Sequence, residues 1–218
     1  MKIDRDGYAF AAVPAAGALM AGLAGRRVLA GSLTLSSVLL AAFFRDPDRG
    51  PDLSPLPDDV VIAPADAKIM YTGPGQAGVA PEGEWSQVSM FLSLTDVHIN
   101  RAPYGGTVTS VVHRRGRYLA AYRADSAQLN ERSEVRVERT VDGQQRVVVF
   151  HQVVGVAARR VVTRISAGDQ IATGERIGLM RFGSRMDVFL PPTAEVAVSS
   201  GQKVVAGETV LARFGGGR

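Results

Sequence analysis

Two uncharged stretches near the N-terminus constrain the fold of this chain most strongly. Residues 8–25 and 28–44 contain no Asp, Glu, Lys or Arg, and Arg26 and Arg27 separate them. Each stretch is close to the roughly 20 apolar residues that a helix needs to cross a bilayer core. Gly and Ala are abundant in both, which allows two helices to approach closely. The stretches therefore predict a helical pair within residues 1–50.

Four interpretations of this pair compete: a cleaved secretory signal, two full membrane spans, a hairpin that dips into one leaflet, and a pair buried in a soluble core. Asp4, Asp6 and the second apolar stretch argue against a cleaved signal. Positive residues occur at all three ends, at positions 2, 5, 26, 27, 45 and 49. Two crossings would leave one arginine pair on the disfavoured side of the membrane. We therefore favour a membrane-embedded hairpin, with the rest of the chain on the cytoplasmic face of the cell membrane.

The composition changes after Phe44, where a polar, turn-rich segment leads into a different kind of sequence in residues 51–218. Short Val- and Ile-rich segments alternate there with Gly, Pro, Asp and Asn. They are 60–62, 67–71, 87–92, 107–112, 134–138, 145–154, 161–165, 185–190, 194–198 and 209–213. This spacing predicts a mainly β domain, a barrel or a sandwich, with one short helix near 126–131.

Two segments of this region resemble each other. Residues 166–175 and 200–208 share the pattern Gly-polar-x-apolar-x-x-Gly-Glu, and a β-like stretch follows each. The pattern suits a strand, a tight turn and a returning strand, as in lipoyl and biotinyl carrier domains, because glycine supplies the positive φ angles of such turns.

The composition also limits the chemistry. Without cysteine, the chain can form no disulfide scaffold, no thiolate nucleophile and no Cys-based zinc site. Its three histidines are not paired at a metal-ligand spacing, so we expect no metal. The formal charge of +4 suits an anionic membrane or a phosphate-bearing substrate and is too weak to indicate nucleic acid.

A Gly-Ser pair near the C-terminus offers a way to make an electrophile without a bound cofactor. Gly183 and Ser184 lie between the apolar segments 177–180 and 188–190. The serine hydroxyl can attack the carbonyl carbon of the preceding glycine and convert the peptide bond into an ester. Elimination then cuts the chain and leaves dehydroalanine, which hydrolyses to a pyruvoyl group. Gly-Ser by itself is usually only a turn.

Three other elements carry groups suited to catalysis or binding. His98 lies in a polar cluster after an apolar segment and has the side chain best suited to move protons near neutral pH. Asp66 precedes a predicted strand and can orient a histidine, although an aspartate here also suits a simple turn. Arg159 and Arg160 suit a phosphate or carboxylate.

Together these elements resemble the phosphatidylserine decarboxylase family in its short bacterial and archaeal form. The resemblance covers nearly the whole chain and rests on six pieces in the family's order. They are Phe43–Pro47 after the apolar hairpin, Pro64–Asp66, Asp96–Pro103, Asn130–Arg132, Gln152–Gly155 with Ala158–Arg160, and Phe182–Arg185.

The resemblance implies a proenzyme that cleaves itself between residues 183 and 184. The larger chain is then 1–183, and the smaller chain of 35 residues begins with a pyruvoyl group made from Ser184. A Schiff base with the substrate amine leads to release of CO2 and formation of phosphatidylethanolamine. It also implies that His98 donates a proton during decarboxylation and that Asp66 assists proton transfer for Ser184. We expect Arg159, Arg160 and Arg101 to hold the lipid phosphate.

Two departures leave the base for Ser184 open. Longer family members carry a second histidine where this chain has Arg101, and a glycine where it has Ala67. Either His98 performs both tasks or a strained Gly183–Ser184 bond needs less help. The alternative function is a membrane-tethered, lipoyl-like carrier or adaptor without activity. The lipid's glycerol stereochemistry, the depth of the hairpin and a possible homodimer also stay open.

Overall fold

The computed structural model describes residues 2–49, 56–156 and 160–215. The chain divides into two compact units, Met1–Asp48 and Arg49–Arg218. We call them the helical unit and the β unit and describe each by itself.

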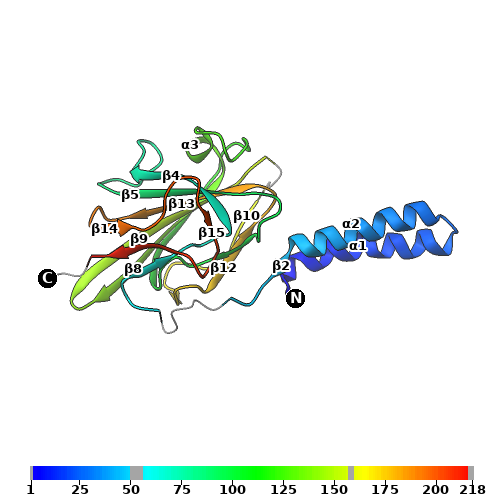
Figure 1. Ribbon diagram of the computed structural model, residues 1–218, viewed down its shortest axis with the longest axis horizontal. Helices are drawn as coiled ribbons and strands as arrows, with labels where there is room; N and C mark the ends of the chain where they lie inside the picture. The colour runs from blue at the N-terminus through cyan, green and yellow to red at the C-terminus, as the bar shows by residue number, and fades with distance from the viewer. Residues whose placement is uncertain (1, 50–55, 157–159, 216–218) are drawn as a thin grey trace. The chain divides into compact units, whose positions relative to one another are not determined.

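The helical unit is an antiparallel hairpin of two helices closed by a two-stranded ribbon (Figure 1). Its elements are β1 (Lys2–Ile3), α1 (Arg5–Leu23), α2 (Arg27–Phe43) and β2 (Arg45–Asp46). The Asp4 carboxylate caps α1 by accepting a 3.0 Å hydrogen bond from the backbone N–H of Asp6. The uncharged stretches thus form the two helices predicted for them.

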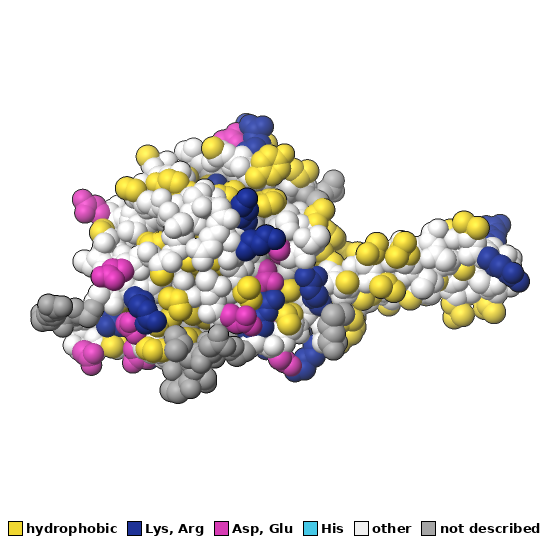
Figure 2. All heavy atoms as spheres, in the orientation of Figure 1, with side chains coloured by type: hydrophobic (Ala, Val, Ile, Leu, Met, Phe, Trp, Pro, Cys, Tyr) yellow, Lys and Arg dark blue, Asp and Glu magenta, His cyan; other side chains and the backbone are white. Residues whose placement is uncertain are grey.

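The surface of the hairpin is apolar. Its most exposed large hydrophobic side chains include Val13, Leu23, Val28 and Leu39. Figure 2 shows hydrophobic and uncharged side chains along the visible face, with basic side chains at the tip. Among the described helices, neither this pair nor any other has the length and hydropathy needed to span a bilayer.

The β unit contains the remaining strands and one short helix, α3 (Ser126–Leu129). The strands are β3 (Val60–Ile62), β4 (Ala67–Pro74), β5 (Ser86–Leu92), β6 (Ile99–Arg101), β7 (Gly106–Arg114), β8 (Arg132–Val141), β9 (Gln144–Val153), β10 (Val161–Thr163), β11 (Gln170–Ile171), β12 (Arg176–Met180), β13 (Ser184–Leu190), β14 (Ala194–Val196), β15 (Lys203–Val204) and β16 (Val210–Phe214). The prediction of a mainly β domain is confirmed, and each of the ten predicted segments contains or overlaps a strand.

The largest sheet has eight strands in the order β11-β7-β8-β9-β13-β5-β4-β15 and curls into a half-barrel (Figure 1). Two three-stranded sheets, β10-β12-β6 and β14-β16-β3, complete the unit. Strand β13 is central and pairs antiparallel with both β5 and β9. All seven of its residues are buried. Its first residue is Ser184, so the predicted cleavage point lies where this strand begins.

The internal repeat occupies the two edges of the large sheet. Strands β11 and β15 occupy equivalent positions in the two copies of the repeat. Strand β11 pairs with β7 at one edge of the eight-stranded sheet, and β15 pairs with β4 at the other. In each copy the second glycine has a positive φ, 84° for Gly174 and 80° for Gly207. The N–H of Gly174 donates to the carbonyl of Ala102, and the N–H of Gly207 donates to that of Ala63. The repeat therefore anchors two Ala-Pro segments that lead to the predicted site.

These two segments also bind each other reciprocally. The N–H of Ile62 donates to the carbonyl of Pro103, and the N–H of Arg101 donates to the carbonyl of Pro64. The first segment continues to Asp66, and the second follows directly from His98. Backbone pairing thus fixes together two chain segments that are more than 30 residues apart in the sequence.

Candidate active site

The Gly183–Ser184 pair lies at a tight turn between β12 and β13. Phe182 has φ 53° and Gly183 has φ 71°, so two consecutive residues adopt left-handed backbone. This conformation costs a non-glycine residue roughly 1–2 kcal/mol. Ser184 is fully buried, and its hydroxyl donates to the carbonyl oxygen of Arg181 at 3.3 Å. The serine is therefore held at a strained turn that begins a central strand.

Gly155 closes one side of the Gly183 carbonyl, the group that the serine hydroxyl would attack. An ideal Cβ built on Gly155 would lie 1.7 Å from the Gly183 oxygen and 3.5 Å from Cβ of Ala121. Real Cβ atoms do not approach an oxygen so closely, so only glycine fits here without a shift of the backbone. The sequence placed Gly155 in a family motif, but nothing in the sequence predicted this contact.

Asn130 fixes the backbone that carries Gly155. Its side-chain amide donates to the carbonyl oxygens of Val154 and Leu119, each at 2.8 Å, and its carbonyl oxygen accepts from the N–H of Leu119 at 2.9 Å. The residue is fully buried. Asn130 therefore ties the loop before α3 to the end of β9 beside the Gly183 carbonyl.

His98 reaches the same turn from the loop before β6. Its Nε2 accepts a long hydrogen bond from the N–H of Gly183, with an N···N distance of 3.5 Å. Its Nδ1 lies 2.9 Å from the carbonyl oxygen of Asp96, which can only accept. The two partners assign the proton to Nδ1 and leave the lone pair of Nε2 facing the turn. The imidazole is buried and oriented as a base would be.

The loop that carries His98 is closed by a second aspartate. The carboxylate of Asp96 accepts hydrogen bonds from the N–H and the hydroxyl of Ser93, both at 2.7 Å. This local ring fixes the turn after β5 and so aims the backbone carbonyl of Asp96 at His98.

Asp66 lies beside the loop of His98 and holds an ion pair. Its carboxylate accepts two hydrogen bonds from the guanidinium of Arg49 and one of 2.9 Å from the N–H of Ala206. Burial alone would raise the pKa of Asp66, but hydrogen bonds from Arg49 and from the amides of Ala206 and Val97 outweigh it and lower the pKa below its usual value. The carboxylate is therefore ionised near neutral pH. The partner Arg49 was not predicted as a site residue.

The three arginines predicted to bind substrate occupy different environments. Arg101 is buried, and its guanidinium donates to the carbonyl oxygen of Gly174 at 3.0 Å. Arg160 is exposed. Arg159 lies outside the described residues.

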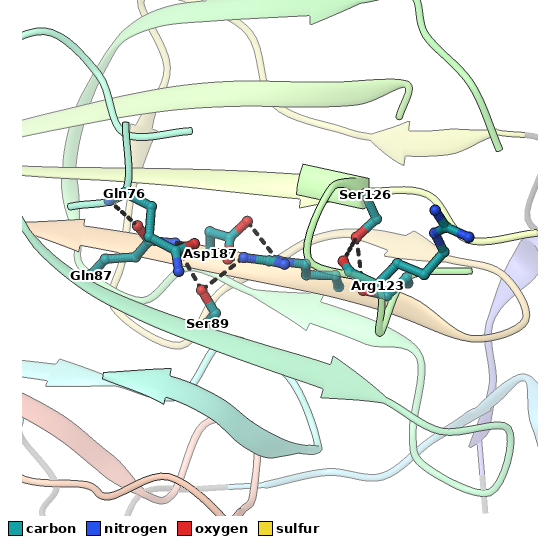
Figure 3. A network of polar contacts seen from close by, with 8 residues as sticks. Gln76, Gln87, Ser89, Arg123, Ser126 and Asp187 are labelled. Atoms are coloured by element: carbon teal, nitrogen blue, oxygen red, sulfur yellow. Dashed lines mark hydrogen bonds and ion pairs between the residues drawn. The ribbon is translucent and has the colours of Figure 1, made fainter. Parts of the chain in front are cut away.

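A buried ionic network directly follows the serine. The guanidinium of Arg185 donates to the carboxylate of Asp187 at 2.9 and 3.0 Å and to the hydroxyl of Ser89 at 3.0 Å. Gln87 extends the network to the N–H of Gln76, and Figure 3 shows the contacts that lead from β13 across β5. A buried charge is tolerated only when it is paired and hydrogen-bonded in this way. The network locks the register of β13 immediately beyond Ser184.

His151 shares this polar face of the sheet but takes no part in the turn. It is buried on β9, its ring lies 4.7 Å from that of Phe189, and its Nδ1 has no hydrogen-bond partner. Burial lowers the pKa of His151 from 6.5 to about 4, and the nearby Asp187 and Glu134 carboxylates oppose the shift only in part. The imidazole of His151 is therefore neutral near pH 7 in the folded protein.

The lowered pKa makes folding stability depend on pH. Between pH 6.5 and about 4 the unfolded chain binds a proton at His151 and the folded chain does not, so stability falls as the pH falls through this window. The full loss is roughly 3 kcal/mol, at 1.36 kcal/mol for each pKa unit. We expect chemical denaturation of His151→Gln to show a smaller loss between pH 7 and 4.5 than the parent chain. His113→Gln is the matched control, and an equal loss in all three proteins would contradict the assignment.

Among the described residues, the site is marked neither by a cluster of metal ligands nor by the cavity described next. Within the described ranges, no cluster of three or more His, Asp or Glu side chains could hold a metal ion. A cavity of about 930 Å³ is lined mainly by residues of β7, β8, the start of β9 and the repeat that contains β11, and none of the predicted catalytic residues lines it. The uncut chain thus encloses its serine, and the site is defined by contacts at the turn.

Comparison with known proteins identifies the family of this chain. The model of the family described as "Phosphatidylserine decarboxylase" matches residues 37–212. A phosphatidylserine decarboxylase proenzyme of Solibacter usitatus is 42% identical over 214 residues, which cover 98% of this chain and 97% of the relative. Proenzymes of the same name from Novosphingobium aromaticivorans and Erythrobacter litoralis are 40% and 38% identical, covering 98% and 99% of this chain and 87% and 89% of the relatives. The chain therefore belongs to the phosphatidylserine decarboxylase family.

Proposed function

We propose that this chain cuts itself between Gly183 and Ser184 and then decarboxylates phosphatidylserine with the pyruvoyl group that the cut creates. The activity is that of the family to which the chain belongs, and its members are pyruvoyl-dependent. The observation that carries the assignment to this bond is the strained turn at Phe182 and Gly183, where the Nε2 of His98 faces the N–H of Gly183. The Ser184 hydroxyl is held within the same turn by the carbonyl of Arg181. Family membership does not favour the carrier or adaptor alternative.

The residues at the turn can perform each step of the cut. The Ser184 oxygen attacks the Gly183 carbonyl carbon while a base takes its proton. The bond from this carbon to the Ser184 nitrogen then breaks, the nitrogen takes up a proton to become an amine, and the acyl group is left on the oxygen as an ester. Loss of the Cα proton of Ser184 then expels the Gly183 carboxylate. Hydrolysis of the remaining dehydroalanine releases ammonia. Left-handed backbone at Phe182 raises the energy of the uncut turn and so favours its opening.

The position of Ser184 fits a pyruvoyl group. It is the first residue of β13, and its neighbour Arg185 is held by Asp187 and Ser89, so the new end stays fixed after the cut. When formed, the group supplies a carbonyl that condenses with the substrate amine and draws electrons from the breaking carbon–carbon bond. Ser184 is fully buried in the uncut chain. The substrate therefore reaches this position only after the freed end at Gly183 moves away.

His98 and Asp66 supply the protons and the charge around this position. The Nε2 of His98 takes the proton of Ser184 during the cut and returns a proton to the substrate carbon after CO2 has left. The Asp66 carboxylate accepts from the N–H of Val97 and so holds the backbone next to His98. Exposed Arg160 is our first choice for the lipid phosphate among the described arginines.

The two chains formed by the cut would stay together. The smaller chain contributes β13 to the centre of the large sheet, β15 to its edge, and β14 and β16 to the sheet that contains β3. Its separation would break the pairing of β13 with β5 and β9, of β15 with β4 and of β16 with β3, and would expose the buried residues of β13. The exposed apolar surface of the helical unit supports a hairpin that lies in the membrane where the lipid substrate is found.

An intact mass spectrum of the purified protein tests the proposed cut. We expect two chains, with the smaller one lighter by one ammonia than residues 184–218 that begin with unmodified serine. A cut at another bond, or a chain that stays whole after long incubation, would exclude the mechanism. Production of phosphatidylethanolamine by the cut protein then tests the reaction.

Replacing His98 with alanine tests its role as the base. Because general-base catalysis contributes about 10²–10⁴-fold, we expect self-cleavage to slow by a factor in this range. The measurement is the fraction of cut chain with time after synthesis. His113→Ala removes an exposed histidine that lies 3.3 Å from Glu131, and it should cleave at the parent rate. Cleavage of His98→Ala at the parent rate would contradict the assignment.

A further inference from the structure

The most exposed large apolar side chains of the described β unit gather at one place. Leu94, Tyr122 and Val156 are 62%, 68% and 61% exposed, and the next in this unit, Tyr118, is 41% exposed. They come from three separate loops, after β5, before α3 and after β9. Isolated exposed apolar residues are normal, but three neighbouring ones mark an interaction surface.

Strand pairing puts all three at the end of the sheet where Ser184 lies. Ser184 pairs with Leu92, two residues before Leu94. Arg185 pairs with Val153, three residues before Val156. The ring of Tyr122 lies 6.0 Å from that of Phe91 in an edge-on contact, and Phe91 also pairs with Arg185. We call Leu94, Tyr122 and Val156 the apolar rim.

Basic residues accompany the rim. The loop 115–125 between β7 and α3, which carries Tyr122, contains Arg115, Arg117 and Arg123 and one acidic residue, Asp125. All three arginines are exposed, and Arg123 is paired with Asp125. Exposed Arg160 follows Val156 closely along the chain. Aromatic and apolar tips beside arginines suit the headgroup level of an anionic bilayer, where the rings enter the interface and the cations face phosphates.

We propose that the apolar rim is a second membrane contact, in the β unit itself, which inserts into an anionic lipid surface and presents the end of β13 to it. The inference rests on the proposed function, because it names the surface through which that site meets its lipid. The rim lies beside the position that the substrate must reach, so a lipid would enter the site without leaving the bilayer.

A fluorescent probe at the rim tests this contact separately from any binding by the hairpin. Because the chain has no cysteine, Val156→Cys creates a single attachment point for nitrobenzoxadiazole in the full-length protein. Gln144→Cys is the matched control, since it is exposed at the β8–β9 turn, about 30 Å along the strands from the rim. The vesicles contain phosphatidylcholine and phosphatidylglycerol in equal amounts, with brominated acyl chains as the quencher.

We expect the probe at 156 to brighten on these vesicles and to be quenched by the brominated chains, while the probe at 144 does neither. Equal behaviour of the two probes would overturn the proposal, including the case in which the hairpin alone holds the protein on the vesicle. The fluorescence measurement requires neither self-cleavage nor turnover of lipid. A failure of the proposed function and a failure of the rim contact are therefore distinguishable.

A triple variant supplies the second readout. Leu94→Ser, Tyr122→Ser and Val156→Ser together should lower turnover of phosphatidylserine in vesicles about tenfold. Self-cleavage and turnover of a short-chain, water-soluble phosphatidylserine should stay unchanged. Val112→Ser is the control, because it removes an exposed apolar side chain within β7. It should change neither self-cleavage nor the turnover of either lipid substrate. An equal loss on both substrates, or no loss on vesicles, would overturn the proposal.

Discussion

Ser184→Ala is expected to remain a single uncut chain without decarboxylase activity. Alanine has no oxygen to attack the Gly183 carbonyl and cannot become a pyruvoyl group, so one substitution removes both the cut and the catalytic carbonyl. The loss is complete, unlike the partial loss expected for a general base. Gel electrophoresis and an assay of lipid products measure the two effects.

The fold should survive this change. The Ser184 hydroxyl has one described hydrogen bond, to Arg181 at 3.3 Å, and its removal costs about 1 kcal/mol. Ser133→Ala is the matched control, because Ser133 is also a buried strand serine and its hydroxyl has no partner. The control should cut and turn over lipid normally. Two chains from Ser184→Ala would show that another bond is cut.

Gly155→Ala is expected to slow self-cleavage by tenfold or more, although it changes no reacting group. The added Cβ would lie 1.7 Å from the Gly183 oxygen, so the carbonyl or the strand end must move. A shift that removes only about 1.4 kcal/mol of transition-state stabilisation lowers the rate tenfold. Overpacking should also lower the free energy of unfolding by about 1–3 kcal/mol.

A matched substitution separates the contact from the general effect of replacing glycine. An added Cβ on Gly31 meets nothing within 4 Å, so Gly31→Ala should leave cleavage unchanged. The cleavage rate after synthesis is measured for both variants in the chain that retains Ser184. Denaturant unfolding is measured for both in the Ser184→Ala background, where the chain stays whole. Parent-like cleavage of Gly155→Ala would show that the carbonyl position is not critical.

Local patterns in the sequence were sufficient to predict the two long helices and the long strands. The uncharged stretches predicted α1 and α2, and Val- and Ile-rich segments predicted the long strands, because both signals are carried by neighbouring residues. The short strands β11 and β15 were not among the Val- and Ile-rich segments, and only the repeat pattern around them suggested a strand followed by a turn. They consist of two residues each and exist because the edges of the large sheet offer them partners.

The sequence also identified the family and predicted Gly183-Ser184 as the reacting pair, because this pair and the motifs around His98 and Asp66 are contiguous. What surrounds them was decided by the tertiary structure. Gly155 meets the Gly183 carbonyl through the pairing of β9 with β13, and Arg49 meets Asp66 across 17 positions of the chain. Such contacts depend on strand register and on the reciprocal bonds of the Ala-Pro segments. No local pattern encodes these long-range distances, and they determine which groups face the Gly183–Ser184 bond.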